Sequence, residues 1–142
     1  MKIQYKLGGE KLLKCQTCGK PADKHHIVYR SQGGLDFPLN FKYLCSEHHR
    51  GKNGPHKNKK IDLEYKLEMQ KQLQKLLCKK FYRLDELTTL LQINKRMLKK
   101  LLKDYKLYKE GYKSIDVIYR LMGNKTYAEY MMEEYYDFTA NF

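Results

Sequence analysis

The sequence predicts a small α+β protein in which two short strands and a helix come first and a helical region follows. Three of the four cysteines and all five histidines lie within residues 15–56, which predicts a compact unit held by a metal. Apolar residues then recur at helical spacing over residues 61–77, and two short amphipathic segments joined by a tight turn follow in residues 82–112. The expected parts are residues 1–60, a linking or packing helix over 61–78, and a helical region over 79–142.

The composition is that of a globular chain with a modest core. Of the 142 residues, 42% are hydrophobic and 32% are charged, which suits one ordinary domain or two very small ones. A unit below roughly 70–80 residues usually needs a staple such as a metal. No apolar run approaches the ~20 residues of a membrane span, and the N-terminus lacks the apolar stretch of a signal peptide. We therefore expect a cytoplasmic protein with reduced thiols and no membrane partner.

The charge is strongly positive and unevenly spread. The formal net charge is +13, and the excess of basic residues is concentrated in residues 1–60 and 79–113. A polyanion is therefore the first partner to consider, and nucleic acid is the polyanion that such a chain most often binds.

Four residues have the spacing of a structural zinc site. Cys15 and Cys18 form one CxxC pair, and Cys45 with His48 forms a CxxH pair later in the chain. Two such pairs supply the four ligands of a tetrahedral zinc ion. The alternative is a redox pair of Cys15 and Cys18, which leaves Cys45 and His48 without a purpose. The remaining Cys78 falls in the apolar stripe of the next helix and is predicted to be buried.

The other histidines are His25, His26, His49 and His56. We expect strands over Lys24–Tyr29 and Phe41–Leu44, joined by a Gly- and Pro-containing loop, and then a short helix capped by Ser46 and ended by Gly54-Pro55. Neighbouring residues on a strand point to opposite faces, so one histidine of the pair can bind a catalytic metal while the other activates water. His49 faces away from His48 and offers a second ligand. Asn40 is placed either to hold an imidazole in one tautomer or to close the loop. A metal and an oriented imidazole are sufficient for phosphodiester hydrolysis.

The order CxxC, HHI, SxGG, Asn and LCxxHH, followed by a basic tail with a further histidine, resembles the HNH endonucleases, which have the ββα-metal fold. The resemblance covers Cys15–His56. It implies that His25 and His49 bind a catalytic divalent ion, that His26 is the general base and that Asn40 is the middle residue of the motif. It also implies Mg²⁺ or Mn²⁺ as the catalytic ion, with Zn²⁺ or Ni²⁺ as alternatives, beside a structural Zn²⁺.

Three features of the resemblance are less regular. Colicin-type nuclease domains have a further metal-binding histidine soon after the helix. Here His56 is the candidate, at a longer spacing, and Asn53 is the weaker one. Lys24 stands where an acidic residue is common, and Tyr29 stands where many members have proline.

The segment Tyr82–Tyr112 predicts a helix-turn-helix, with Asn94 as the N-cap of its second helix. Small HNH proteins of phages and prophages often carry such a helical DNA-binding region, so the resemblance implies a bacterial or phage-infected cell. The alternative is a helical cap with solvated lysines. The side chains predicted to contact nucleic acid are Arg30, Arg50, Lys52, Lys95, Arg96, Lys99, Lys100 and Lys103.

The predicted function is metal-dependent hydrolysis of double-stranded DNA. The alternative is a zinc-dependent nucleic-acid-binding protein without catalysis, such as a regulator or a packaging accessory. RNA stays open as a substrate, since a basic surface does not distinguish the two nucleic acids. One active site per chain makes a nick the default product, and both a monomer and a homodimer remain open. A last helix is predicted over Tyr127–Phe138.

Overall fold

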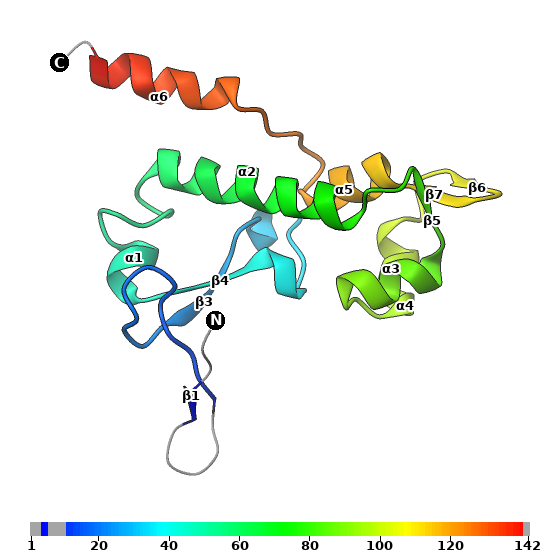
Figure 1. Ribbon diagram of the computed structural model, residues 1–142, viewed down its shortest axis with the longest axis horizontal. Helices are drawn as coiled ribbons and strands as arrows, with labels where there is room; N and C mark the ends of the chain where they lie inside the picture. The colour runs from blue at the N-terminus through cyan, green and yellow to red at the C-terminus, as the bar shows by residue number, and fades with distance from the viewer. Residues whose placement is uncertain (1–3, 6–10, 141–142) are drawn as a thin grey trace.

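The computed structural model describes residues 4–5 and 11–140 and shows a mixed α+β protein (Figure 1). In chain order its elements are β1 (Gln4–Tyr5), β2 (Lys11–Leu12), β3 (Asp23–His26), β4 (Phe41–Leu44), α1 (Ser46–Arg50), α2 (Lys59–Leu76), β5 (Phe81–Tyr82), α3 (Leu84–Leu91), α4 (Lys95–Leu101), β6 (Leu107–Tyr108), β7 (Gly111–Lys113), α5 (Ser114–Leu121) and α6 (Tyr130–Ala140). Two 3-10 turns, Arg30–Gln32 and Pro38–Asn40, lie between β3 and β4. Within the described ranges, no helix is long and apolar enough to cross a membrane.

The strands β3 and β4 form an antiparallel hairpin, and α1 follows it directly. Asp23 lies opposite Leu44, and His26 lies opposite Phe41. The first strand ends at His26, three residues before the predicted end, because the Val28 N–H donates to the side chain of Asn40 instead of to the ladder. The short helix is capped by Cys45 and ends at Arg50, so the predicted boundaries at Ser46 and Gly54-Pro55 were each displaced.

The loop between the strands is closed by the buried amide of Asn40. Its Nδ2 donates to the carbonyl oxygens of Val28 at 3.0 Å and Leu35 at 2.8 Å, while its Oδ1 accepts from the Val28 N–H at 2.7 Å. A Cβ at Gly34 would lie 1.8 Å from the Val28 oxygen, so only glycine allows this close approach. Of the two roles considered for Asn40, the structure shows the closing of the loop.

The long helix α2 runs through the middle of the molecule, between the β3–β4 hairpin and the C-terminal elements (Figure 1). It begins two residues before the predicted Ile61 because the Asn58 side chain accepts from the N–H groups of Lys60 and Ile61. A single core of buried side chains joins α2 to both halves of the chain. The core contains Ile27, Val28 and Phe37 from the hairpin region, Leu63, Leu67, Met69 and Leu73 from α2, and Leu87, Leu98, Val117 and Leu121 from beyond it.

The prediction for Cys78 was wrong. The helix α2 ends at Leu76, and Cys78 lies in the turn that follows, where its side chain is exposed. The apolar stripe of the helix therefore stops two residues too early to bury this thiol.

The helices α3 and α4 form the predicted helix-turn-helix. The Asn94 side chain accepts from the Met97 N–H at 2.8 Å, as the capping pattern predicted. The turn is made by Gln92, which has a left-handed backbone with φ of 57°.

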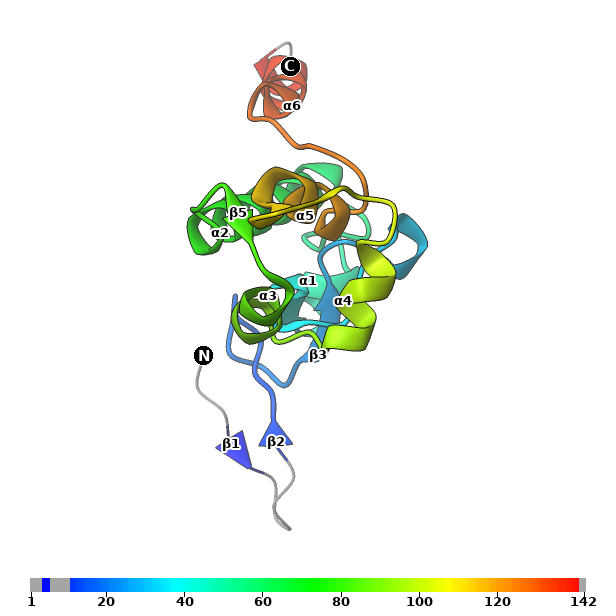
Figure 2. The ribbon, with the colours of Figure 1, turned by 90° about the vertical axis from the view of Figure 1, so that its right-hand side faces the viewer.

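A three-stranded sheet packs beside these helices, where the sequence predicted only helical structure. Its order is β5-β7-β6, with both pairs antiparallel. Figure 1 labels the three strands, and in Figure 2 the helices α3 and α4 lie below β5 and α5. Gly111 allows the sheet to form, because a Cβ there would lie 2.3 Å from the Tyr82 oxygen. Strands of two or three residues are too short to show an alternating pattern, so this correction depends on pairing between distant segments.

The segment before α6 is extended, which places the start of α6 at Tyr130 and not at the predicted Tyr127. The backbone of Tyr127 is paired with the buried side chain of Gln70 on α2. Gln70 Nε2 donates to the Tyr127 oxygen at 2.7 Å, and the Tyr127 N–H donates to Gln70 Oε1 at 2.8 Å.

We predict that Gln70→Leu lowers the free energy of unfolding by about 1–3 kcal/mol, because it leaves the buried N–H and C=O of Tyr127 without partners. Urea unfolding of the zinc-loaded protein measures the change. The exposed Gln74→Leu on the same helix is the control and is expected to change stability little. Equal stabilities of the two variants would contradict the anchoring role of Gln70.

Candidate functional site

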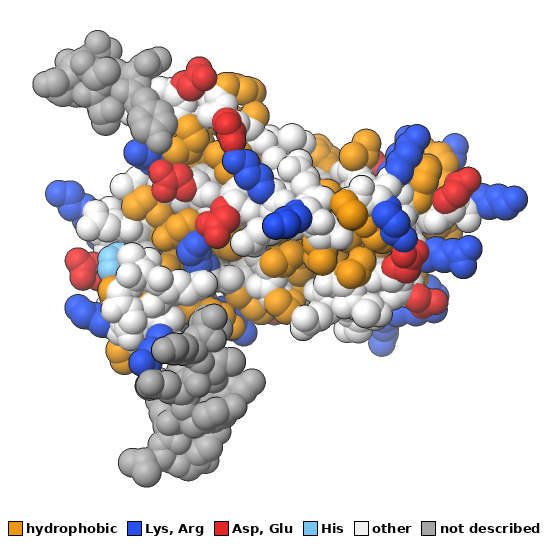
Figure 3. Space-filling view, in the orientation of Figure 1, with side chains coloured by type: hydrophobic (Ala, Val, Ile, Leu, Met, Phe, Trp, Pro, Cys, Tyr) orange, Lys and Arg blue, Asp and Glu red, His pale blue; other side chains and the backbone are white. Residues whose placement is uncertain are grey.

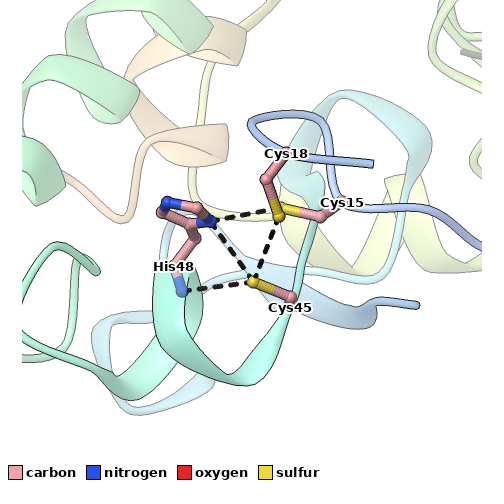
Figure 4. Close-up of side chains that lie close together, drawn as sticks. All are labelled: Cys15, Cys18, Cys45 and His48. Atoms are coloured by element: carbon pink, nitrogen blue, oxygen red, sulfur yellow. Dashed lines mark hydrogen bonds between the residues drawn. The ribbon is translucent and has the colours of Figure 1, made fainter. Parts of the chain in front are cut away.

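The first cluster combines two cysteines from a turn after β2 with two ligands at the start of α1. The Gly19 N–H donates to the Cys15 oxygen at 2.9 Å and closes the turn that carries Cys15 and Cys18. Cys45 directly follows β4 and caps α1, and His48 lies in the first turn of that helix. All four side chains point toward one another (Figure 4).

The spacing of these atoms suits a tetrahedral zinc ion. The Sγ atoms of Cys18 and Cys45 lie 3.6 Å apart, and His48 Nδ1 lies 3.2 Å from Cys45 Sγ and 3.7 Å from Cys15 Sγ. Bonds of about 2.3 Å to sulfur and about 2.0 Å to nitrogen would separate such ligand atoms by roughly 3.5–3.8 Å. Cys15, Cys18, Cys45 and His48 are therefore close enough to bind a metal ion such as zinc.

The thiols of this cluster are partly prepared for metal binding. Burial raises the pKa of Cys15, but N–H groups of Cys45, Cys18 and Thr17 outweigh it and lower the pKa to about 6. The N–H of His48 likewise lowers the pKa of Cys45. For Cys18, the N–H of Lys20 favours the thiolate, yet burial and the neighbouring thiols prevail and raise the pKa. A bound cation would favour the thiolate form of Cys18 as well as those of Cys15 and Cys45, because the thiolate is the form that binds metal.

The second cluster is a triangle of imidazoles, His25, His49 and His56. They come from β3, from α1 and from the turn after α1, and their ligand atoms all lie within 4.8 Å of one another. His49 Nε2 and His56 Nε2 are 2.9 Å apart. His25 is 1% exposed, and its Nε2 makes no hydrogen bond to any atom in the described parts of the chain.

The pKa values of all three imidazoles are lowered, which favours their neutral form, although His56 itself is exposed. Burial lowers the pKa of His25 to about 3, with the charges of His49 and His56 as further causes. Burial is also the largest cause of the lowered pKa values of His49 and His56. A neutral imidazole has a free lone pair and is a ligand for zinc, copper, iron or nickel. The triangle therefore fits a metal with nitrogen ligands, and the orphaned Nε2 of His25 is the atom that such an ion would satisfy.

His56 reaches the triangle because the chain folds back over the end of α1. The Gly54 N–H donates to the Gly51 oxygen at 3.0 Å, and the His56 N–H donates to the His49 oxygen at 3.5 Å. A Cβ at Gly54 would lie 2.4 Å from that same His49 oxygen. This tight turn brings His56 to His49 despite a sequence spacing that had made its role doubtful.

Tyr29 packs against two of the three imidazoles. Its ring is stacked on His56 at 5.1 Å between centroids and meets His25 edge-on at 5.7 Å. On α2, the Lys66 ammonium lies 4.6 Å from the centre of the Tyr29 ring. Lys66 is buried and is held by Asp62 at 2.6 Å. Sequence reasoning missed this contribution, because α2 showed only an apolar stripe and Tyr29 only a departure from the motif.

His26 points to the other side of β3. Its Nε2 donates to Asp36 Oδ1 at 2.6 Å, and Arg30 Nη2 donates to Asp36 Oδ2 at 3.1 Å. The hydrogen bond from His26 is the largest cause of the lowered pKa of Asp36. Asp36 was not among the predicted site residues, since its loop carried no spacing signal.

The predicted nucleic-acid contacts are all exposed. Arg50 and Lys52 lie beside the histidine triangle, at the end of α1 and just after it, whereas Arg30 is paired with Asp36. On α4, Lys95 is paired with Asp85 at 3.2 Å. The other exposed α4 cations are Arg96, Lys99 and Lys100, with Lys103 just after the helix. Figure 3 shows further Lys and Arg side chains at the end of the molecule formed by β6 and β7, where Lys106 and Lys109 are exposed.

No family model, no curated protein and no solved structure matches this chain. The resemblance carried by the motif order therefore stays a prediction, and function has to be inferred from the residues and their geometry.

We predict that Cys15→Ser abolishes zinc binding at the first cluster and lowers the melting temperature markedly, because binding free energy at a structural zinc site is folding free energy. Metal analysis and thermal unfolding measure the two effects. Cys78→Ser removes an exposed thiol outside both clusters and is expected to keep the wild-type zinc content and melting curve. A wild-type melting curve for Cys15→Ser would contradict the structural role.

We predict that Tyr29→Leu weakens metal binding at the histidine triangle about 10–100-fold, the usual range for residues that orient metal ligands. Tyr29→Phe keeps the stacked ring and is expected to bind nearly as the wild type. Cobalt titration separates the two sites, since thiolate ligands give charge-transfer bands and an all-imidazole site does not. Equal affinities for Tyr29→Leu and Tyr29→Phe would show that the ring does not position His56.

Proposed function

We propose that this chain is a metal-dependent endonuclease of the HNH type that hydrolyses phosphodiester bonds in double-stranded DNA. The observation that carries the proposal is that the two adjacent histidines of β3 lie in different environments. The Nε2 of His25 is buried, has no hydrogen-bond partner in the described parts of the chain and lies close to the neutral imidazoles of His49 and His56. His26 lies on the other side of β3 and is hydrogen-bonded to Asp36. A zinc-stabilised binding module has no need of either arrangement.

His25, His49 and His56 would hold the catalytic ion. Bound there, a divalent ion would neutralise charge on the scissile phosphate and on the leaving oxygen. The resemblance to HNH enzymes put Mg²⁺ or Mn²⁺ first, but Mg²⁺ prefers oxygen ligands and keeps several waters. Three imidazoles instead favour Zn²⁺ or Ni²⁺, and we propose an ion of this kind for the triangle.

His26 is the proposed general base, and Asp36 is its positioning residue. When His26 donates its Nε2–H to the Asp36 carboxylate, the lone pair is left on Nδ1, which is the atom that would accept a proton from water. The carboxylate also stabilises the imidazolium that forms after the transfer. Arg30 holds the other oxygen of Asp36 and so keeps the carboxylate in place.

DNA as the substrate is supported by charge and by α4. The net charge is +13, and α4 carries several exposed cations and no acidic residue. A capped second helix of a helix-turn-helix is an element that enters the major groove of DNA. The single histidine triangle in the described part of the chain favours a nick over a double-strand break.

A second candidate is a DNA-binding protein without cleavage. It is favoured by the helix-turn-helix and the adjacent three-stranded sheet, which are complete without any histidine. This reading leaves the neutral histidine triangle and the His26–Asp36 pair without a role.

We predict that the wild-type protein converts supercoiled plasmid to open circles when it is stripped of metal, reloaded with zinc at the first cluster and then given a divalent ion. His26→Ala is expected to slow this about 10²–10⁴-fold, the usual contribution of a general base. Asp36→Asn is expected to slow it less. Gel analysis of plasmid forms over time, with Mg²⁺, Mn²⁺, Ni²⁺ and Zn²⁺ compared, makes the measurement.

The zinc content and DNA affinity of His26→Ala serve as controls, and both should equal those of the wild type. An intact plasmid with every ion, together with a normal mobility shift, would favour the binding protein. Equal rates for His26→Ala and the wild type would remove His26 from the chemistry.

A further inference from the structure

An open cleft lies between the turn that follows β3 and the start of α4. Its lining comes from both sides: Arg30, Gly34, Leu35 and Asp36 on the turn, and Gln92, Ile93, Asn94 and Met97 at the helix-turn-helix. Asp36 is the hydrogen-bond partner of His26. Asp36, the hydrogen-bond partner of the proposed general base, therefore lines the same cleft as the start of the helix that is proposed to contact DNA.

The two walls of this cleft are fixed relative to each other. Arg120 Nη1 on α5 donates to the Gly33 oxygen at 3.1 Å. A Cβ at Gly123 would lie 2.3 Å from the Gln32 oxygen, which shows how tightly the end of α5 packs against the turn. Phe37 on one side and Ile93 on the other belong to the same buried core. The walls are joined by packing and not by a free linker.

The surface along the cleft is accessible, and it combines the charged side chains of Arg30 and Asp36 with apolar ones such as Leu35 and Met97. The Arg30 side chain is 71% exposed even though it pairs with Asp36. Met97 is 42% exposed at the opposite wall, and Lys100 lies one turn further along α4 with its side chain also exposed. A nucleic-acid strand that leaves His26 would meet Arg30 first and then the basic side of α4.

We propose that one DNA duplex lies across this cleft and contacts the His26 site and α4 at the same time, so that hydrolysis occurs at a fixed number of base pairs from the sequence that α4 contacts. The proposal rests on the proposed endonuclease function. It adds that the substrate is a single continuous duplex and that the distance between recognition and cleavage is set by the fold. A protein whose two parts were joined by a mobile linker would instead cut over a range of distances.

The first test maps nicks at nucleotide resolution on a fragment that carries one preferred binding site. A single dominant nick at a constant distance from the footprint is the expected result. When five base pairs are inserted between the footprint and the original nick, the nick should move onto the inserted sequence and keep its distance. Nicks that scatter, or that stay with the original sequence, would overturn the proposal.

The second test does not depend on cleavage. Hydroxyl-radical footprints are recorded on the His26→Ala background, where the DNA stays intact. Two variants are compared on this background: Arg30→Ala, and the double variant Lys99→Ala with Lys100→Ala. Each is expected to lose protection at one end of a continuous footprint, and the two are expected to lose it at opposite ends. The control is Lys71→Ala, since this exposed lysine pairs with Glu129 near α6, and its footprint should be unchanged.

The two tests separate the two proposals. If the wild type never nicks DNA but the variants lose protection at opposite ends of one footprint, the endonuclease proposal is overturned and the shared-duplex proposal stands. If the wild type nicks DNA but both variants shorten the footprint at the same end, or neither variant shortens it, the endonuclease proposal stands and the shared-duplex proposal is overturned. An absence of any footprint overturns both.

Discussion

The β3–β4 hairpin has very little apolar core of its own, and this shortage shapes the rest of the structure. Among the described residues, the buried cluster on one side of it consists of Cys15, Leu44 and Cys45, with Ala22 and Tyr65 partly buried against them. Units of this size usually depend on a metal or on a neighbouring element for stability. Here the hairpin has both kinds of support, because the Cys/His cluster lies at one end and Ile27, Val28 and Phe37 enter the core formed with α2 at the other.

This dependence explains why the candidate site and the helix-turn-helix are not independent modules in space. The side chains that anchor the hairpin in the core follow His26 almost immediately, so the site is positioned by the same packing that holds α3 and α4. The buried Lys66 on α2 adds a second link, since it lies against Tyr29, which packs on the imidazoles. A helix that shows only an apolar stripe in the sequence thus supports the geometry of the proposed metal centre.

The site itself follows from the two-residue period of a strand. His25 and His26 are neighbours in sequence, yet one is buried in a group of neutral imidazoles and the other pairs with a carboxylate near the surface. A single strand therefore creates two different chemical environments a few ångströms apart. The proposed mechanism uses this difference, with one imidazole as a ligand and its neighbour as a base.

Much of the local structure and of the candidate site was predictable from short-range sequence patterns. The paired CxxC and CxxH spacings, the adjacent histidines, the Asn94 cap and the apolar stripe of α2 all reflect interactions over a few residues, where spacing determines which side chains share a face. The short strands β5, β6 and β7, the exposed position of Cys78 and the late start of α6 were not predictable in this way. Each depends on a contact between distant segments, such as the pairing of Gln70 with Tyr127.

The sequence by itself determined the α+β class, the four residues of the first cluster and the choice of histidines as the candidate reactive groups. Only the tertiary structure decided that His56 joins His25 and His49, that Asp36 orients His26 and that Tyr29 and Lys66 pack around the triangle. The physical reason is that spacing along a strand or helix specifies which way a side chain points, whereas loop closure and core packing specify what it meets.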